Sequence, residues 1–187
     1  LVCIVGPTAT GKTKRAIQLS QLEPSIIVSA DSRQVYRGMD IVTGKDHPSD
    51  IVLYGIDIVD PDDDCSVSVW YDAVIPHIHD AWDLGKQVIV VGGTGLYVKA
   101  ITNGIETMSV PLNQTLRDEL SLLSITKLKE LLNEQDHAKF SSLNNSDVNN
   151  PRRLIRAIEI AVHGANPKSI FTTPKSMVIG LKYSVES

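Results

Sequence analysis

Residues 1–13, LVCIVGPTATGKT, place a short apolar run directly before a glycine-rich turn, and this stretch decides the fold. Residues 6–13 fit the pattern G-x-x-x-x-G-K-[ST] at every fixed position. Between a strand and a helix, such a loop points several backbone N–H groups at a phosphate, and the helix dipole adds positive charge. The sequence therefore predicts a phosphate-binding loop made of Gly6, Pro7, Thr8, Ala9, Thr10, Gly11, Lys12 and Thr13.

Two side chains of this loop add chemistry of their own. Lys12 supplies a positive charge to phosphate oxygens, and Thr13 offers a hydroxyl group to Mg²⁺, the cofactor that we expect. The alternative is a chance glycine-rich turn, which the apolar run before the loop and the helical pattern after it disfavour. The motif indicates a phosphate ligand and specifies neither a nucleotide nor hydrolysis.

Short apolar runs alternate with helical segments along the first 104 residues. Strands are expected at residues 1–5, 25–29, 51–59 and 88–91, and helices at residues 12–22 and 66–84, with Pro76 kinking or splitting the second helix. Continuous apolar strands joined by helices are typical of a parallel sheet that is covered on both faces. We therefore expect an α/β fold, a P-loop NTPase-like parallel sheet flanked by helices.

The composition changes after Gly104. Residues 105–150 carry no strand signal and contain one good amphipathic helix near residues 125–133, which predicts a small helical insertion. Pro151 begins a further helix that ends at Gly164. The sequence thus predicts a catalytic core at residues 1–104, the insertion at 105–150, and a return to the core at 151–187 that is truncated at its C-terminal end.

Charge and composition narrow the class of protein. The chain of 187 residues has 18 Lys and Arg against 22 Asp and Glu, and a net charge of −4 excludes a globally basic nucleic-acid binder but not a local basic patch. No apolar run approaches the ~20 residues that cross a bilayer. Cys3 and Cys65 are far apart and predict no disulfide framework. We expect a reduced, cytoplasmic protein without a membrane segment.

A carboxylate follows the second predicted strand. Residues 25–29 lead into Asp31, whereas the run at residues 88–91 leads into two glycines and Thr94, where P-loop NTPases usually carry a magnesium-binding Asp. Asp31 is therefore expected at the carboxyl edge of the sheet, where open α/β sheets bind ligands. Asp31 and Thr94 also fit helix N-caps, and for Asp31 the two roles are compatible.

Four blocks of sequence occur together, and in this order they closely resemble the tRNA dimethylallyltransferase (tRNA isopentenyltransferase) family. The resemblance extends over roughly residues 1–164, and the second block is the most specific. The blocks are GPTATGKT at residues 6–13, SADSRQVYRGMDI at 29–41 with TGK at 43–45, GGTGLY at 92–97, and PRRLIRAIE at 151–159.

The resemblance implies a prenyl transfer. The dimethylallyl group of dimethylallyl diphosphate would move to N6 of the adenosine just 3′ of the tRNA anticodon, giving N6-isopentenyladenosine. The loop and Mg²⁺ would hold the diphosphate, Lys12 would neutralise the leaving group, and Asp31 would accept the N6 proton. Thr94 would support the donor or the reacting centre.

The resemblance also implies a surface for the anticodon stem-loop of tRNA, with the helical insertion as part of it, in a protein expected to be monomeric. Without the resemblance, Arg152, Arg153 and Arg156 would be read as a solvated helix face, and positions 152 and 156 share one side of that helix because they lie four residues apart. The implied tRNA contacts are Asp31, Ser32, Arg33, Gln34, Thr94, Arg117, Arg152, Arg153, Leu154, Ile155 and Arg156.

The sequence departs from the family pattern in three places. Residues 53–57, LYGID, replace a His-rich stretch, the insertion is short, and the chain ends at Ser187 where the family continues with arginine-bearing helices. Three alternatives stay open: a transferase that prenylates free adenine nucleotides, a P-loop small-molecule kinase, and a non-enzymatic or inactive P-loop module. Prenylation of AMP or phosphoryl transfer from ATP would identify the first two.

Overall fold

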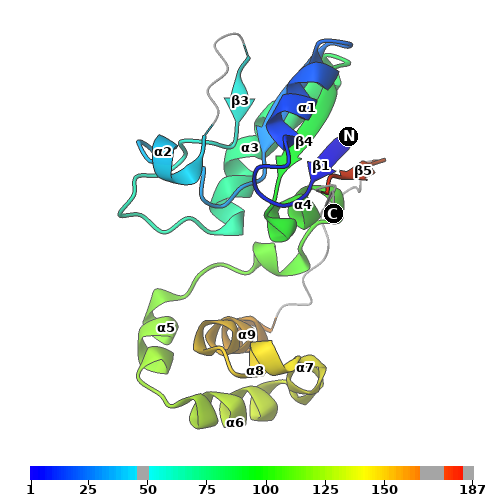
Figure 1. The fold of residues 1–187 in the computed structure, drawn as a ribbon. Helices are drawn as coiled ribbons and strands as arrows, with labels where there is room; N and C mark the ends of the chain where they lie inside the picture. The colour runs from blue at the N-terminus through cyan, green and yellow to red at the C-terminus, as the bar shows by residue number, and fades with distance from the viewer. Residues whose placement is uncertain (46–50, 165–174, 183–187) are drawn as a thin grey trace, which may run out of the picture. The chain divides into compact units, whose positions relative to one another are not determined.

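The computed structural model describes residues 1–45, 51–164 and 175–182. The chain forms two compact units, which Figure 1 draws as a ribbon. The core unit comprises residues 1–105 and 171–187, and the helical unit comprises residues 106–170.

Parallel strands build the core unit, as the apolar runs predicted. Across the sheet the order is β3-β2-β4-β1-β5, and each neighbouring pair is parallel. The third strand is shorter than expected, because only two residues pair with β2. The strands are β1 (Val2–Val5), β2 (Ser25–Ser29), β3 (Leu53–Tyr54), β4 (Gln87–Gly92) and β5 (Met177–Gly180).

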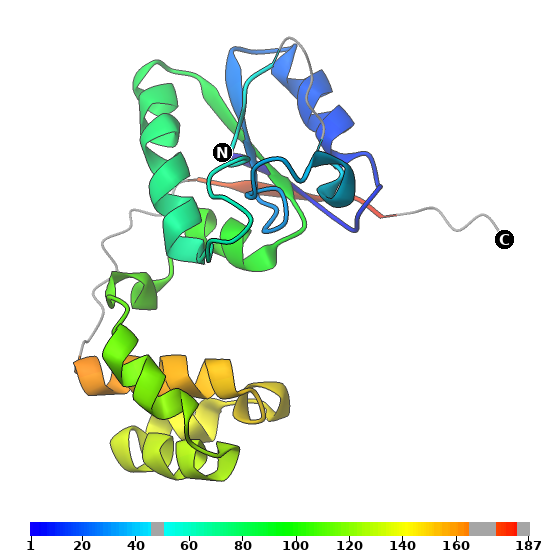
Figure 2. The ribbon, with the colours of Figure 1, turned by 90° about the vertical axis from the view of Figure 1, so that its left-hand side faces the viewer.

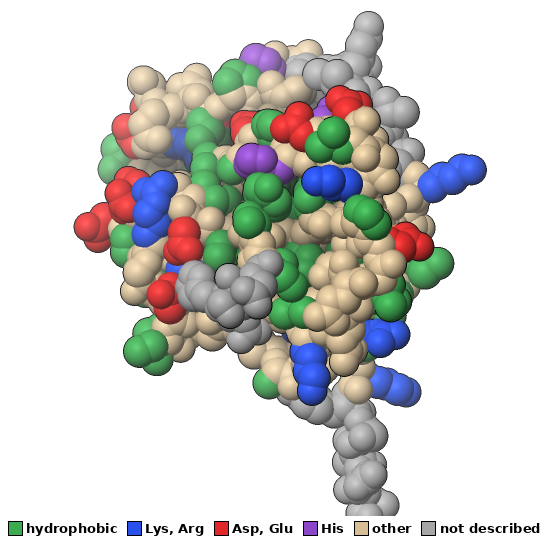
Figure 3. Space-filling model, turned by 90° about the horizontal axis from the view of Figure 1, so that it is seen from above, with side chains coloured by type: hydrophobic (Ala, Val, Ile, Leu, Met, Phe, Trp, Pro, Cys, Tyr) green, Lys and Arg blue, Asp and Glu red, His purple; other side chains and the backbone are tan. Residues whose placement is uncertain are grey.

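Helices cover both faces of this sheet, as predicted. Figure 2 shows β2 and β4 between α1 (Lys12–Ser20) on one face and α3 (Val67–Asp83) on the other. Two further helices, α2 (Asp40–Thr43) and α4 (Gly95–Thr102), follow β2 and β4. Figure 3, the view from above, shows basic and acidic side chains interspersed with hydrophobic ones on this side of the molecule.

Pro76 lies inside α3 without splitting it. The helix is continuous over seventeen residues, so the predicted split is wrong. Pro76 itself is exposed, whereas Trp70, Val74 and Ile78 of the same helix are fully buried. This buried stripe at helical spacing packs the helix on the sheet, and such packing outweighs one lost backbone hydrogen bond.

The helical unit contains more helices than the sequence predicted. Within it lie η1 (Glu106–Ser109), α5 (Gln114–Ser121), α6 (Ile125–Gln135), α7 (His137–Ser142), α8 (Asn145–Val148) and α9 (Pro151–His163). Polar residues between these helices cap them. The side chains of Asp136, Asn144 and Asn150 each accept a hydrogen bond from the first turn of the following helix.

The helix α9 belongs to the helical unit, so the boundary expected before Pro151 is wrong. Its apolar face packs into a cluster with Leu120, Leu128 and Leu132 of α5 and α6. Leu154 and Ile158 contribute to this cluster from α9, one turn apart, and are at most 2% exposed. Packing of its apolar face against α6 therefore decides which unit α9 belongs to.

Over the residues that the structure describes, no helix is both long and apolar enough to cross a bilayer.

Candidate active site

The predicted phosphate loop joins β1 to α1. Gly11 adopts a left-handed conformation, φ +78°, directly before the first residue of α1. Within the loop, the Thr10 hydroxyl donates to the Pro7 carbonyl at 2.8 Å, and Lys12 Nζ donates to the same oxygen at 2.6 Å. The loop therefore forms a closed turn that is held by its own side chains.

The strand end beside this loop leaves no room for a side chain at Gly6. A Cβ atom there would lie 2.4 Å from the carbonyl oxygen of Leu181, which follows β5. The Leu181 N–H donates to the Val5 carbonyl at 2.7 Å, so β5 supports the loop on one side. On the other side, a Cβ at Gly93 would come within 3.6 Å of the Gly6 carbonyl. The loop thus lies between the ends of β5 and β4.

Asp31 caps a turn rather than a helix. Its Oδ1 accepts a hydrogen bond from the Arg33 N–H at 3.0 Å, and its carbonyl accepts one from the Gln34 N–H at 3.2 Å. The residues after Asp31 form a turn, so the helix N-cap reading is wrong for this position. The turn holds the Asp31 carboxylate at the carboxyl edge of β2.

Thr94 is bonded to this turn. Its Oγ1 accepts a hydrogen bond from the Ser32 N–H at 2.9 Å and lies 3.3 Å from the Ser32 hydroxyl. Its backbone N–H donates to the Ala30 carbonyl at 3.0 Å. Thr94 is the N-cap residue of α4 by position, as the capping alternative expected, but its side chain makes no cap hydrogen bond. The hydroxyl instead joins the ends of β4 and β2.

The two strand ends approach closely because Gly92 has no side chain. A Cβ at Gly92 would lie 2.1 Å from the carbonyl oxygen of Ala30. The structure therefore brings three predicted features to one edge of the sheet. These are the phosphate loop after β1, the Asp31 turn after β2, and Thr94 after β4, the strand between them.

An aromatic pair supports this edge, and sequence reasoning missed it. Trp70 of α3 donates from Nε1 to the Ser29 carbonyl at 3.0 Å and stacks on Tyr97 of α4 with ring centroids 4.2 Å apart. Burial raises the pKa of Tyr97, and Cys65 beside its hydroxyl raises it further. The signal in the sequence was the helical spacing of Trp70 with the buried Val74 and Ile78.

Gln34, predicted to contact tRNA, has its amide engaged within the protein. Its Oε1 accepts from the Ser29 hydroxyl at 2.8 Å, and its Nε2 donates to the Gly44 carbonyl at 3.3 Å. Ser32 and Arg33, by contrast, are exposed. The side chain of Gln34 therefore anchors the turn to the rest of the protein, and Ser32 and Arg33 remain exposed.

Apart from Arg33, the basic residues predicted for tRNA lie in the helical unit, and they divide into two groups. Arg117 of α5 and Arg156 of α9 bind the carboxylate of Glu159, which is 2% exposed. Arg156 also donates from Nη2 to the carbonyls of Thr107 at 2.7 Å and Val110 at 3.0 Å. These two arginines stabilise the packing of the unit.

The remaining residues of the predicted segment lie on different faces of α9. Arg152 is exposed, and Arg153 pairs with Asp147 of α8. Leu154 is fully buried in the core of the unit, and Ile155 is half-buried. Arg152 and Arg153 are therefore the members of this segment whose charges reach the surface.

The group at the phosphate loop that could hold a magnesium ion is the hydroxyl of Thr13. Thr13 is half-buried in the first turn of α1, next to Lys12. Within the described part of the chain, no three His, Cys, Asp or Glu residues gather where they could hold a metal by themselves. Mg²⁺ commonly takes one or two protein oxygens and completes its shell with substrate phosphates and water. Such a shell would need only the Thr13 hydroxyl.

Known proteins resemble this chain over most of its length. A tRNA dimethylallyltransferase of Exiguobacterium sp. is 40% identical over 171 residues, which are 88% of this chain and 54% of that protein. The tRNA dimethylallyltransferase 1 of Syntrophus aciditrophicus is 43% identical over 169 residues, 87% of this chain and 54% of that protein. The chain thus spans about half the length of the curated relatives it matches.

Solved structures share the P-loop NTPase-like fold. A eukaryotic dimethylallyltransferase acting on tRNA aligns with a TM-score of 0.79 and 26% identity, over 97% of this chain and 48% of that one. The tRNA isopentenylpyrophosphate transferase of Bacillus halodurans aligns with a TM-score of 0.59 and 34% identity, over 96% and 58%.

Two sequence families match the chain directly. The family described as isopentenyl transferase matches residues 1–56, which contain the phosphate loop and the Asp31 turn. The family described as IPP transferase matches residues 34–185, which contain Thr94 and the helical unit. The second match extends over most of the sequence, and the chain belongs to the IPP transferase family.

Proposed function

We propose that the protein containing this chain is a tRNA dimethylallyltransferase. It moves the dimethylallyl group of dimethylallyl diphosphate to N6 of the adenosine 3′ of the anticodon. One observation carries the proposal: Asp31 and Thr94 are joined through Ser32 at the ends of neighbouring strands, beside the phosphate loop. The names of the relatives support the same activity.

The arrangement suits a transfer in which a diphosphate leaves an allylic carbon. The bond between C1 of the donor and the diphosphate oxygen breaks, and a bond from N6 to C1 forms. The backbone N–H groups of the loop and Lys12 neutralise the charge that develops on the diphosphate, and Lys12 exchanges the Pro7 carbonyl for a phosphate oxygen. Mg²⁺ bound at Thr13 would supply further positive charge to the same oxygens.

The acceptor amine needs a base because its lone pair is delocalised into the adenine ring. In the proposed reaction Asp31 receives the proton that N6 loses. The turn around Asp31 keeps one carboxylate oxygen bonded to the Arg33 N–H, which orients the other. Thr94 fixes this turn against β4, next to the loop that holds the leaving group.

The acceptor has to be unstacked from the anticodon loop, so backbone contacts are needed to hold the RNA. Ser32 and Arg33 next to the base, and Arg152 and Arg153 on α9, have charges or hydroxyls at the surface and are the residues proposed for this role. We further propose that the protein is cytoplasmic, because its substrate would be tRNA, and that it acts as a monomer.

Product analysis tests the proposal. The complete protein should form N6-isopentenyladenosine in an anticodon stem-loop when it is given dimethylallyl diphosphate and Mg²⁺, and AMP should react far more slowly. The control is the same stem-loop with guanosine in place of the target adenosine. Faster prenylation of AMP would assign the protein to free nucleotides. Phosphoryl transfer from ATP without prenylation would assign it to the kinases.

A further inference from the structure

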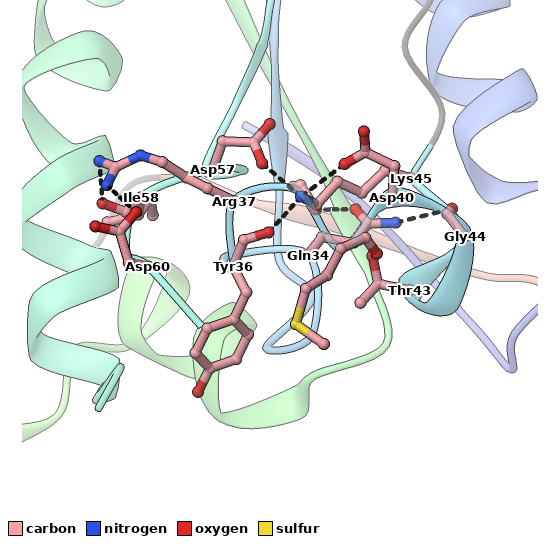
Figure 4. A network of polar contacts seen from close by, with 12 residues as sticks. Gln34, Tyr36, Arg37, Asp40, Thr43, Gly44, Lys45, Asp57, Ile58 and Asp60 are labelled. Atoms are coloured by element: carbon pink, nitrogen blue, oxygen red, sulfur yellow. Dashed lines mark hydrogen bonds and ion pairs between the residues drawn. The ribbon is translucent and has the colours of Figure 1, made fainter. Parts of the chain in front are cut away.

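The side chain of Lys45 is fully buried in the loop that follows the Asp31 turn. Its exposed fraction is 0%, and lysine is rarely buried unless it is paired. Figure 4 shows its ammonium group among three acceptors. They are the Tyr36 carbonyl, the Asp57 carboxylate and, at 3.1 Å, Oδ1 of Asp40.

These acceptors keep Lys45 charged. Burial alone lowers the pKa of Lys45, but hydrogen bonds and ion pairs with Asp57 and Asp40 outweigh burial and raise it. The two carboxylates remain partly in water, with exposed fractions of 34% and 50%. The ammonium group therefore links Tyr36, Asp40 and Asp57, and its buried charge is paired.

Asp57 transmits this contact to Gln34. Its φ is +54°, a left-handed conformation that aspartate adopts more readily than most residues other than glycine. In this conformation the Asp57 N–H donates to the Gln34 carbonyl at 3.1 Å. The bond to Lys45 therefore holds Asp57 where it fastens the backbone of Gln34.

Gln34 in turn is bonded to the Asp31 turn. Its N–H donates to the Asp31 carbonyl at 3.2 Å, and its side chain links the Ser29 hydroxyl at the end of β2 with the Gly44 carbonyl beside Lys45. Lys45 thus reaches Gln34 by two routes, through Asp57 and through Gly44. Both routes end at Gln34, whose N–H is bonded to the carbonyl of Asp31.

We infer that Lys45 is a positioning residue for the transfer reaction, acting through Asp57 and Gln34 to hold the Asp31 carboxylate at the acceptor amine. The inference rests on the proposed function. Rate depends steeply on placement, since a shift of about 1 Å can lower turnover by a factor on the order of 10². The hydrogen bonds of Lys45 go to Tyr36, Asp40 and Asp57, and none of these residues belongs to the phosphate loop, so Lys45 would act on the acceptor side of the reaction.

Lys45→Met in the complete protein tests this role, because methionine keeps the length of the side chain and removes its charge. Turnover on the stem-loop should fall by about tenfold to a hundredfold, while KM for dimethylallyl diphosphate and the dissociation constant for the stem-loop stay near the wild-type values. Asp60→Asn is the matched control, since it breaks the exposed ion pair of Arg37 in the same loop and should leave turnover unchanged.

A double-mutant cycle separates positioning from general loosening of the loop. In an Asp31→Asn background, Lys45→Met should lower turnover little further, because the group that it positions has already been removed. Additive losses, or wild-type turnover in the single variant, would overturn the inference.

The variant Asp57→Asn and the activity of the wild-type protein complete the test. Asp57→Asn removes the charge and tolerates the left-handed backbone, so it should reproduce a milder fall in turnover if Lys45→Met does not fold. An unchanged turnover for Asp57→Asn would then count against the inference. A wild-type protein that prenylates no stem-loop would overturn the proposed function as well, whereas an active wild type with an equally active Lys45→Met overturns the inference alone.

Discussion

Arg117 of α5 and Glu159 of α9 form a two-point ion pair inside the helical unit. Nε of Arg117 lies 2.9 Å from Oε1 of Glu159, and Nη2 lies 2.8 Å from Oε2. The Asn113 N–H also donates to Oε1, at 2.6 Å, and Arg156 binds Oε2. Residues far apart in the chain thus meet at one buried carboxylate.

Removing the Arg117 side chain should destabilise the helical unit. Arg117→Met leaves a carboxylate that is 2% exposed with one of its two arginines, and loss of one partner of a buried pair costs about 3–5 kcal/mol. Hydrogen exchange of the α9 amides in the complete protein measures the loss. Arg153→Ala, which breaks an exposed pair, is the control and should cost at most about 1 kcal/mol. Equal protection in both variants would contradict the prediction.

The same carboxylate predicts how stability depends on pH. Burial alone raises the pKa of Glu159, but bonds from Arg117, the Asn113 N–H and Arg156 outweigh it and lower the pKa from 4.5 to about 2. Because the folded pKa is the lower one, the stabilisation is complete above pH 4.5 and is lost as the pH falls toward 2. It is worth on the order of 3 kcal/mol.

Denaturant unfolding across that pH range measures the effect. Glu159→Gln should lose stability at neutral pH and lose the Glu159 contribution to the acid dependence, so the two curves should converge as the pH falls. Parallel curves would assign the acid sensitivity to other carboxylates.

Arg152 should carry charge to the RNA without supporting the fold. It is exposed on α9, so Arg152→Ala should weaken binding of the stem-loop and reduce the slope of log affinity against log salt by roughly 0.7–0.9, while thermal stability stays unchanged. A salt series of binding measurements tests this. Lys127→Ala, which removes an exposed charge from α6 of the same unit, is the control. An equal change in both variants would make Arg152 an ordinary surface charge.

Asp31→Asn should lower turnover by a factor on the order of 10²–10⁴, the usual range for a positioned proton acceptor. The amide keeps an oxygen for the Arg33 N–H, so the turn should persist. Affinity for dimethylallyl diphosphate should stay the same, because the phosphate loop is a separate segment. Single-turnover kinetics measure the chemical step directly, and a near-normal rate would reduce Asp31 to a turn-forming residue.

The phosphate loop should prefer the prenyl donor. Dimethylallyl diphosphate with Mg²⁺ should raise the melting temperature of the complete protein more than ATP does, since ligand at a hundred times its Kd adds ~2.7 kcal/mol. Lys12→Ala should remove this difference, as the charge that meets the diphosphate is lost. Stronger protection by ATP in the wild type would favour a kinase.

Local patterns in the sequence were sufficient to predict a parallel sheet and to place the candidate site at one of its edges, but not to predict β5 or the order of the strands. The apolar runs and the residues G-K-T at 11–13 predict a strand, loop and helix by themselves, because those contacts lie within a few residues of one another. Asp31 and Thr94 follow two such runs, and parallel strands end at the same edge. Their place at that edge therefore needed no knowledge of packing.

Only the tertiary structure decided what the charged side chains do. Arg156 looks like a surface arginine in the sequence, yet it binds Glu159 and two carbonyls of η1 and the loop after it. Lys45 looks like a solvated lysine in the sequence, yet its side chain is buried and pairs with Asp57, twelve residues further along the chain. A charge is stable inside a protein only where its partners converge on it, and that convergence depends on contacts between distant segments, which periodicity along the chain does not encode.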